Sequence, residues 1–173
     1  MQAEQRQMRI VDPILAEMDQ EAETTRRLFA VIPEDKLSWR PHPKAMTLGE
    51  LALHIATIPG SIAELGKNDI HEVNQIPTPV EATSVEQIKA AFAESLEAGK
   101  AIVGATSDAD AMAEWKLTKD GNTLMGMPRM AFWRAILLNH NYHHRGQLST
   151  YLRELDVPLP SIYGPSADTN PFA

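Results

Sequence analysis

The sequence contains no cysteine among its 173 residues. Disulfide bonds, zinc–thiolate sites and a catalytic thiol within the chain are therefore excluded, and any bound metal must be held by nitrogen and oxygen ligands. Positive charge is also scarce, because 16 Lys and Arg stand against 23 Asp and Glu and the formal net charge is −7. We expect no nucleic-acid partner, since a phosphate backbone is bound by an excess of Lys and Arg.

Long apolar runs are missing as well. No window approaches the roughly 20 apolar residues that cross a membrane, and residues 1–7 are polar, without the apolar centre of a signal peptide. We therefore expect no membrane partner and a cytoplasmic location. The apolar fraction of 43% and the charged fraction of 23% are ordinary for a globular protein. The length suits a single domain over residues 1–173.

Four segments carry apolar residues at the spacing of three and four that is typical of an amphipathic helix. Thr47 with Glu50 has the pattern of a capping box, as does the Ser-Val-Glu-Gln that begins the third segment. The second segment keeps its helical phase across Pro59, which indicates a kinked but continuous helix. The four segments are Asp12 to Ile32, Thr47 to Leu65, Ser84 to Ile102 and Pro128 to Asp156.

These patterns predict an all-α protein, a four-helix bundle with long irregular connections. The connection over 66–83 is long enough to return to the far end of the bundle, because an extended chain covers about 3.3 Å per residue and a helix only about 1.5 Å. The second and third helices are thus free to run parallel. Between 104 and 128, the alternation of Glu114 to Thr118 followed by Asp120-Gly121 indicates a small β excursion.

Histidine is concentrated in the fourth helix, where three of the six histidines fall at 140, 143 and 144. Residues four apart lie on the same face of a helix, so His140 and His144 can aim two imidazoles at one point. The seam that contains both is nearly all apolar, whereas the seam through His140, His143 and Gln147 is mostly polar. We therefore expect His140 and His144 to face the core and His143 to lie at its rim.

A third imidazole comes from His54, which stands in the apolar row of the second helix between Leu51 and Ile58. Burying three histidines in one core without a partner is costly. We interpret His54, His140 and His144 as three ligands of a divalent metal ion, an arrangement that leaves coordination positions open for catalysis. The alternative is that all three are core histidines satisfied by hydrogen bonds. Imidazole suits several ions, and we expect zinc or nickel, with iron or manganese as alternatives.

Three further residues are candidates for a second layer around the metal. Glu50 stands one turn before His54, but its alternative role is that of the capping-box acid. Gln147 can hydrogen-bond a ligand imidazole or a metal-bound water, or simply hold neighbouring backbone. Arg145 can bind an acidic substrate, or lie solvated on a face of the bundle. No residue is assigned as catalytic, because Asn141 stands where an HExxH motif has its glutamate. His42 and His71 fall in predicted loops, and Trp133 is interpreted as a core residue.

Two segments together resemble the DinB/YfiT-like superfamily. They are His-Asn-Tyr-His-His-Arg-Gly-Gln-Leu over 140–148 and Leu-Gly-Glu-Leu-Ala-Leu-His-Ile-Ala over 48–56, and the ending Ser-Ile-Tyr-Gly-Pro-Ser over 161–166 is also similar. The resemblance implies a bundle in up-down-down-up order, commonly dimeric, that holds a divalent metal by three histidines. Carried over by position, these are His54, His140 and His144.

Characterised relatives within this superfamily include S-transferases that use low-molecular-weight thiols and a maleylpyruvate isomerase, while others are described as metal-dependent hydrolases or stress-inducible proteins. The resemblance thus implies a metal-dependent enzyme that activates a thiol or water toward a small-molecule substrate, and it implies a homodimer. The alternative function is that of a non-catalytic, metal-binding and stress-related dimeric protein.

Overall fold

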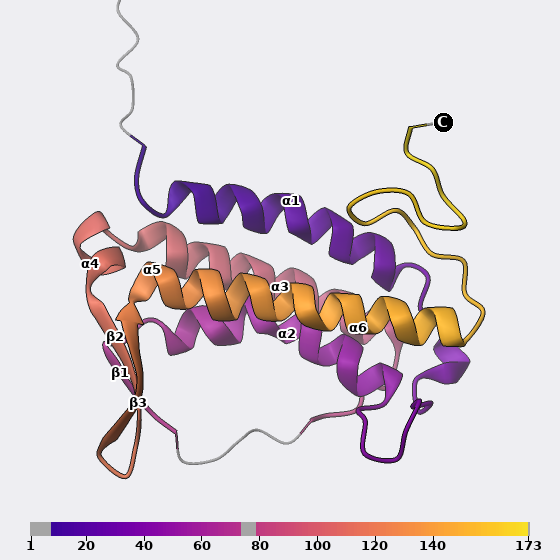
Figure 1. Cartoon of the computed structure of the whole chain (residues 1–173), viewed down its shortest axis with the longest axis horizontal. Coiled ribbons are helices and arrows are strands. Elements are labelled where there is room, and N and C mark those ends of the chain that lie inside the picture. The colour runs from indigo at the N-terminus through magenta and orange to yellow at the C-terminus, as the bar shows by residue number, and fades with distance from the viewer. Residues whose placement is uncertain (1–7, 74–78, 173) are drawn as a thin grey trace, which may run out of the picture.

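Four long helical segments lie side by side in a computed structural model that describes residues 8–73 and 79–172, and a small sheet packs at one end (Figure 1). The mostly helical fold is therefore confirmed, with the sheet as an addition. The long segments are α1 (Asp12–Phe29), α2 (Leu48–Leu65), α3 (Val85–Ala105) and a continuous run of α5 (Arg129–Phe132), the π-helix η2 (Trp133–Asn139) and α6 (His140–Glu154). Shorter helices are η1 (Glu34–Lys36) and α4 (Asp108–Met112).

The directions of the helices agree with the expected order. Following the colours of Figure 1, α1 and the run from α5 to α6 point one way, whereas α2 and α3 both point the other way. The end of α2 and the start of α3 lie at opposite ends of the molecule, and the length of the connection between them allows this parallel pair. Part of that connection, 74–78, lies outside the described residues. No helix in the described ranges is both long and apolar enough to span a membrane.

The start of α2 is set by the local sequence. The Glu50 N–H donates to Thr47 Oγ1 at 3.0 Å, and the Thr47 N–H donates to Glu50 Oε2 at 2.7 Å, so the predicted capping box is present. At α3 the cap is simpler, because Ser84 accepts from the Gln87 N–H but the Gln87 side chain bonds to Thr83. As predicted, α2 is continuous through Pro59.

The sheet has the order β1-β2-β3, from β1 (Ile70–Glu72), β2 (Glu114–Lys119) and β3 (Asn122–Pro128). The hairpin of β2 and β3 confirms the expected β excursion, and its turn places Asp120 at φ 51° and Gly121 at φ 76°. The parallel strand β1 was not predicted, since three residues carry no alternation that a sequence can show. His71 consequently lies half-buried in a strand and not in a surface loop.

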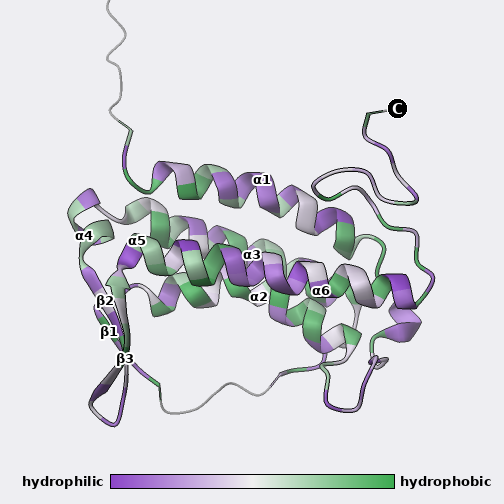
Figure 2. Cartoon of the chain, viewed as in Figure 1, coloured by the Kyte–Doolittle hydropathy of each residue, from purple (hydrophilic) through white to green (hydrophobic). Residues whose placement is uncertain are grey.

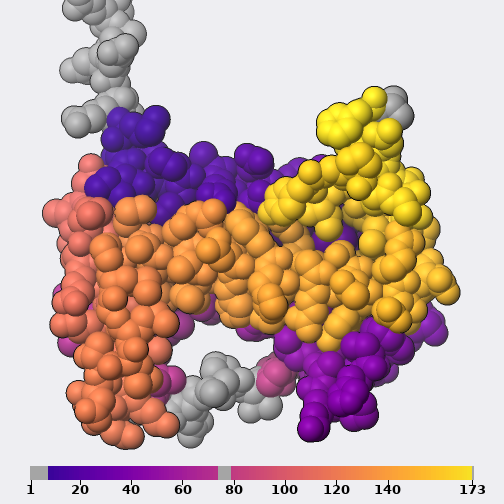
Figure 3. Space-filling model, viewed as in Figure 1, coloured from indigo at the N-terminus to yellow at the C-terminus, as the bar shows by residue number. Residues whose placement is uncertain are grey.

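Apolar side chains fill the space between the helices, and Figure 2 shows green and purple bands alternating along each long helix. Trp133 is fully buried, as predicted. Trp115 joins the sheet to the bundle, because its ring stacks on Phe132 at 3.8 Å and its Nε1–H donates to the Leu65 carbonyl at 3.0 Å. Beyond α6, the C-terminal residues turn back over the bundle toward α1 (Figure 3).

Candidate metal centre

His54 of α2 meets His140 and His144 of α6 at one point between the two helices. One ring nitrogen from each lies within 4.8 Å of the other two. The Nε2 atoms of His140 and His144 are 2.7 Å apart. The ring of His54 packs edge-on against both, with centroid distances of 5.3 Å to His140 and 4.6 Å to His144. The three histidines that the sequence singles out are therefore brought together, while His143 is exposed, as expected.

Burial favours the neutral form of each of these imidazoles. Desolvation lowers the pKa of His54, and the neighbouring His144 lowers it further. Desolvation followed by the charges of the surrounding histidines lowers the pKa of His140 to about 4. The pKa of His144 is also lowered by burial, although its hydrogen bond to Gln147 opposes this shift. Neutral rings keep a free nitrogen lone pair near pH 7, which is the form that binds metal.

Gln147 orients the ring of His144. Its Oε1 lies 3.0 Å from His144 Nδ1, and its Nε2–H donates to the Tyr151 hydroxyl at 3.2 Å. Tyr151 in turn packs edge-on against Trp39 with a centroid distance of 5.6 Å. When Nδ1 carries the proton that Gln147 accepts, Nε2 is left bare and points at the other histidines. Of the roles considered for Gln147, the structure shows the hydrogen bond to the imidazole of the candidate ligand His144.

The donor set fits a metal ion. Three nitrogens converge, and imidazole is a ligand that zinc, nickel and iron accept. The Nε2 atoms of His140 and His144 can form a hydrogen bond only if one of them carries a proton and the other accepts it. The buried Nδ1 of His140 has no hydrogen-bond partner within the described part of the chain, so no bond at that nitrogen fixes the tautomer of the ring. A cation at this point can replace the shared proton.

Glu50 serves the start of α2 in this structure. Its carboxylate accepts the Thr47 N–H and lies 4.0 Å from Arg40, which is the capping alternative considered from the sequence. A role for Glu50 beside the metal stays a prediction that no observed contact supports.

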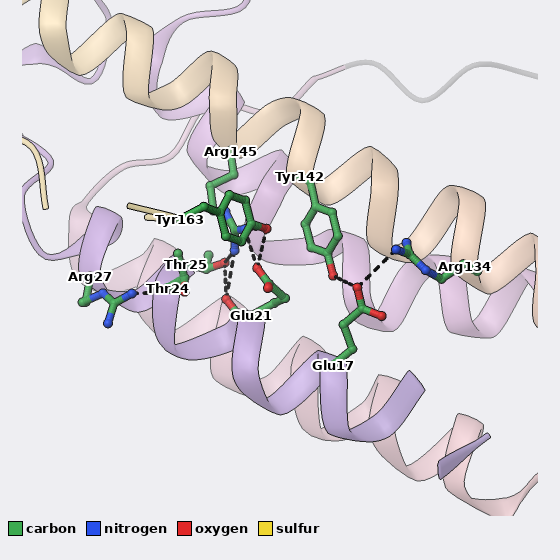
Figure 4. A network of polar contacts seen from close by, with 9 residues as sticks. All are labelled: Glu17, Glu21, Thr24, Thr25, Arg27, Arg134, Tyr142, Arg145 and Tyr163. Carbon is green, nitrogen blue, oxygen red and sulfur yellow. Dashed lines mark hydrogen bonds and ion pairs between the residues drawn. The ribbon is translucent and has the colours of Figure 1, made fainter. Parts of the chain in front are cut away.

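Arg145 differs from the expectation of a solvated side chain, because it is only 1% exposed. Its guanidinium pairs with the Glu21 carboxylate, and it donates to the Glu21 carbonyl at 3.1 Å and to Thr25 Oγ1 at 3.3 Å (Figure 4). It also lies 5.1 Å from the ring centroids of both Tyr142 and Tyr163. Arg145 thus joins α6 to α1 and to the C-terminal tail, with its charge neutralised by Glu21.

The inward face of α6 is also rotated from the predicted one. Its buried residues are Asn141, Arg145, Leu148, Tyr151 and Leu152, while His140 and His144 are half-buried at the flank. The preceding π-helix explains the shift, because its extra residue per turn changes the helical phase before His140. The buried pairs Phe132 with Leu137 and Trp133 with Leu138 show this spacing of five. The histidines therefore lie at the edge of the core, where a site can be reached from solvent.

Glu21 and Asn141 are two buried polar residues near the site to which the sequence analysis gave no role. Glu21 is 8% exposed and accepts the Tyr163 hydroxyl at 2.7 Å in addition to Arg145. Asn141 is 7% exposed and donates to the Ile55 carbonyl at 3.3 Å. A signal was present for Glu21, since it interrupts the apolar stripe of α1 between Met18 and Ala22.

Comparisons with known proteins agree with the fold. The chain is 25% identical to the Bacillus subtilis (strain 168) protein described as uncharacterized protein YrdA, over 163 residues that cover 91% of this chain and 90% of that protein. A crystal structure of a DinB-like protein from Bacillus cereus ATCC 10987 is similar with a TM-score of 0.67 and 24% identity, covering 86% of this chain and 95% of that one. A second, the DinB-like protein YjoA from Bacillus subtilis, has a TM-score of 0.66 and 21% identity, covering 87% and 97%. The sequence profile of the DinB family matches residues 4–170, and the chain therefore belongs to the DinB family.

Proposed function

We propose that His54, His140 and His144 bind a divalent metal ion and that the chain is a metal-dependent enzyme, a thiol-dependent S-transferase or a hydrolase of a small molecule. The observation that carries this proposal is the convergence of three ring nitrogens within 4.8 Å, in rings whose pKa values are lowered. Three protein ligands leave at least one position for a substrate or nucleophile. When bound, the ion lowers the pKa of a thiol or of a water molecule. Zinc or nickel fits the nitrogen ligands best, with iron or manganese as alternatives.

The surrounding side chains support this use of the site. Gln147 holds the ring of His144 with Nε2 toward the centre. Arg145 and Glu21 fix α6 against α1 and so hold the helix that carries two of the three ligands. Because the chain has no cysteine, the thiol of an S-transferase reaction must come from a separate small molecule.

Elemental analysis of protein purified without an affinity tag or chelator tests the metal proposal. We expect one divalent ion per chain, and its loss in the His140→Ala variant. Metal-free protein that does not take up Zn²⁺ or Ni²⁺ on titration would contradict the proposal.

Calorimetric titration of the metal-loaded protein with glutathione and with free cysteine then separates the two activities. Binding of a thiol favours the transferase. Hydrolysis of ester or amide substrates without any thiol binding favours the hydrolase.

A second candidate function is that of a non-catalytic metal-binding, stress-related dimeric protein. It is favoured by the origin of the ligands on two different helices, since an ion there would link α2 to α6. In that case His140→Ala would chiefly lower the midpoint of thermal unfolding, because metal binding is coupled to folding. An enzyme would instead lose turnover in this variant while the metal-free protein stays folded. Sedimentation equilibrium tests the proposed homodimer.

A further inference from the structure

Pro59 leaves one backbone carbonyl of α2 without its usual partner. In a regular helix, the N–H of residue 59 would donate to the carbonyl of Ile55, but proline has no N–H. The helix nevertheless continues from Leu48 to Leu65 through this point. Ile55 is fully buried, and a buried carbonyl without a donor is strongly unfavourable. A donor from another element is therefore required.

Asn141 supplies that donor from α6. Its side-chain amide donates to the Ile55 carbonyl at 3.3 Å, between residues that are 86 positions apart. Asn141 follows the ligand His140 in the chain, and Ile55 follows the ligand His54. The hydrogen bond thus joins α2 to α6 at the level of the candidate metal centre.

Two other backbone groups of α2 near Pro59 form hydrogen bonds with a side chain of α3. Ser95 Oγ accepts the Gly60 N–H at 2.8 Å and donates to the Thr57 carbonyl at 2.9 Å. These two bonds do not involve α6. Ser95 and Asn141 therefore both satisfy backbone groups of α2 near Pro59. Of these two residues, Asn141 is the one that links α2 to the helix that carries His140 and His144.

We propose that Asn141 is a positioning residue of the metal centre: by bonding the carbonyl that Pro59 leaves free, it sets the spacing of α2 and α6 and hence the distance from His54 to His140 and His144. This inference rests on the metal binding proposed above. Apolar contacts between the helices are non-directional and tolerate small sliding movements. Metal–ligand distances must hold to about 0.2 Å. A directed hydrogen bond one residue away from a ligand on each helix provides that constraint.

Zn²⁺ titration of Asn141→Leu, compared with Ser95→Ala, tests the inference. Asn141 borders a cavity of about 20 Å³, which gives the larger leucine side chain some room. We expect Asn141→Leu to bind Zn²⁺ about 10- to 100-fold more weakly than the wild-type chain. Ser95→Ala should lower the denaturation midpoint of the metal-free protein while its Zn²⁺ affinity stays unchanged. Asn141→Ala is the second variant, should leucine prevent folding.

Substitution of the proline provides the reciprocal test. Pro59→Ala restores a backbone N–H for the Ile55 carbonyl, so Asn141→Leu in that background should lose far less Zn²⁺ affinity than it does in the wild-type background. The d–d absorption of bound Co²⁺ gives a second readout, since a relaxed site should change its intensity in Asn141→Leu but not in Ser95→Ala.

The outcomes separate the two proposals. If wild-type protein binds Zn²⁺ but Asn141→Leu binds it equally well, or loses the same factor in both backgrounds, the positioning role is wrong while metal binding stands. If the wild-type chain binds neither Zn²⁺ nor Co²⁺, the proposed function fails and the positioning role fails with it.

Discussion

The close packing of α3 on α2 at Gly99 and the open space beside Gly146 of α6 predict opposite effects for a glycine-to-alanine substitution. Gly99 of α3 is buried against α2, and a Cβ atom added there would lie 2.6 Å from the Pro59 carbonyl oxygen and 2.9 Å from its carbon. Both are backbone atoms, which cannot rotate away. At Gly146 of α6, an added Cβ would meet nothing within 4 Å. Gly99→Ala should therefore destabilise the protein, and Gly146→Ala should stabilise it.

The magnitude follows from the geometry. Ordinary contact begins at 3.4 Å, so a Cβ at 2.6 Å requires α2 and α3 to separate by the difference, about 0.8 Å. Overpacking of this kind costs about 1–3 kcal/mol, and the better helix propensity of alanine returns at most about 1 kcal/mol. From the middle of that range, about 2 kcal/mol, the net loss for Gly99→Ala is about 1–2 kcal/mol. Gly146→Ala keeps only the propensity gain of about 0.5–1 kcal/mol.

Thermal and urea unfolding of the metal-free proteins measure both effects. For a chain of this size, 1 kcal/mol corresponds to about 2–4 °C in Tm. We expect Gly99→Ala to lower Tm by about 2–8 °C and Gly146→Ala to raise it by about 1–4 °C, with unchanged denaturant m-values. A Gly99→Ala variant as stable as the wild-type chain would refute the close packing of α3 on α2, and a destabilised Gly146→Ala variant would refute the open space at Gly146.

Three other predictions concern the polar groups. Arg145→Met leaves the buried Glu21 carboxylate without its cation and should lower the free energy of unfolding in urea by about 3–5 kcal/mol. Arg153→Met removes a more exposed ion pair and should lower it by at most about 1 kcal/mol. Equal losses would contradict the burial of the pair between Arg145 and Glu21. Because the pKa of His140 is lowered to about 4, the unfolded chain binds more protons than the folded one between about pH 6.5 and 4. The metal-free protein should therefore lose stability as the pH falls through this window. In His140→Gln, the free energy of unfolding should fall less steeply with pH. An identical slope in both proteins would contradict the lowered pKa of His140. Gln147→Leu removes the acceptor for the His144 imidazole and should weaken Zn²⁺ binding about 10-fold or more, as measured by calorimetry. Gln147→Glu keeps an acceptor and should retain binding. A leucine variant with wild-type affinity would exclude a role for Gln147 in orienting His144.

Local rules in the sequence accounted for the helices and for the hairpin. The capping box at Thr47 and the turn at Asp120-Gly121 depend on residues next to one another, so their structures follow from propensity and short-range hydrogen bonds. The metal-ligand candidates were also visible in the sequence. His140 and His144 are one turn apart, and His54 interrupts an apolar row, so the sequence pattern singles out all three residues.

The face of α6 could not be read correctly in the same way. A regular helical period placed His140 and His144 on the core side, but the π-helix before them changes the phase and moves them to the flank. Arg145 was misread for a related reason, since its partner Glu21 lies 124 residues away and nothing in the local pattern shows an acid facing it.

The sequence by itself determined where helices begin and continue, which side chains are available as metal ligands, and that those ligands are nitrogen donors without thiolates. Only the tertiary structure decided that three imidazoles share one point, that Arg145 is buried with Glu21, and that Asn141 bonds the carbonyl freed by Pro59. The physical reason is the range of the interactions. Caps and turns are closed within a few residues, whereas these contacts join segments 86 to 124 positions apart and exist only once the helices have packed.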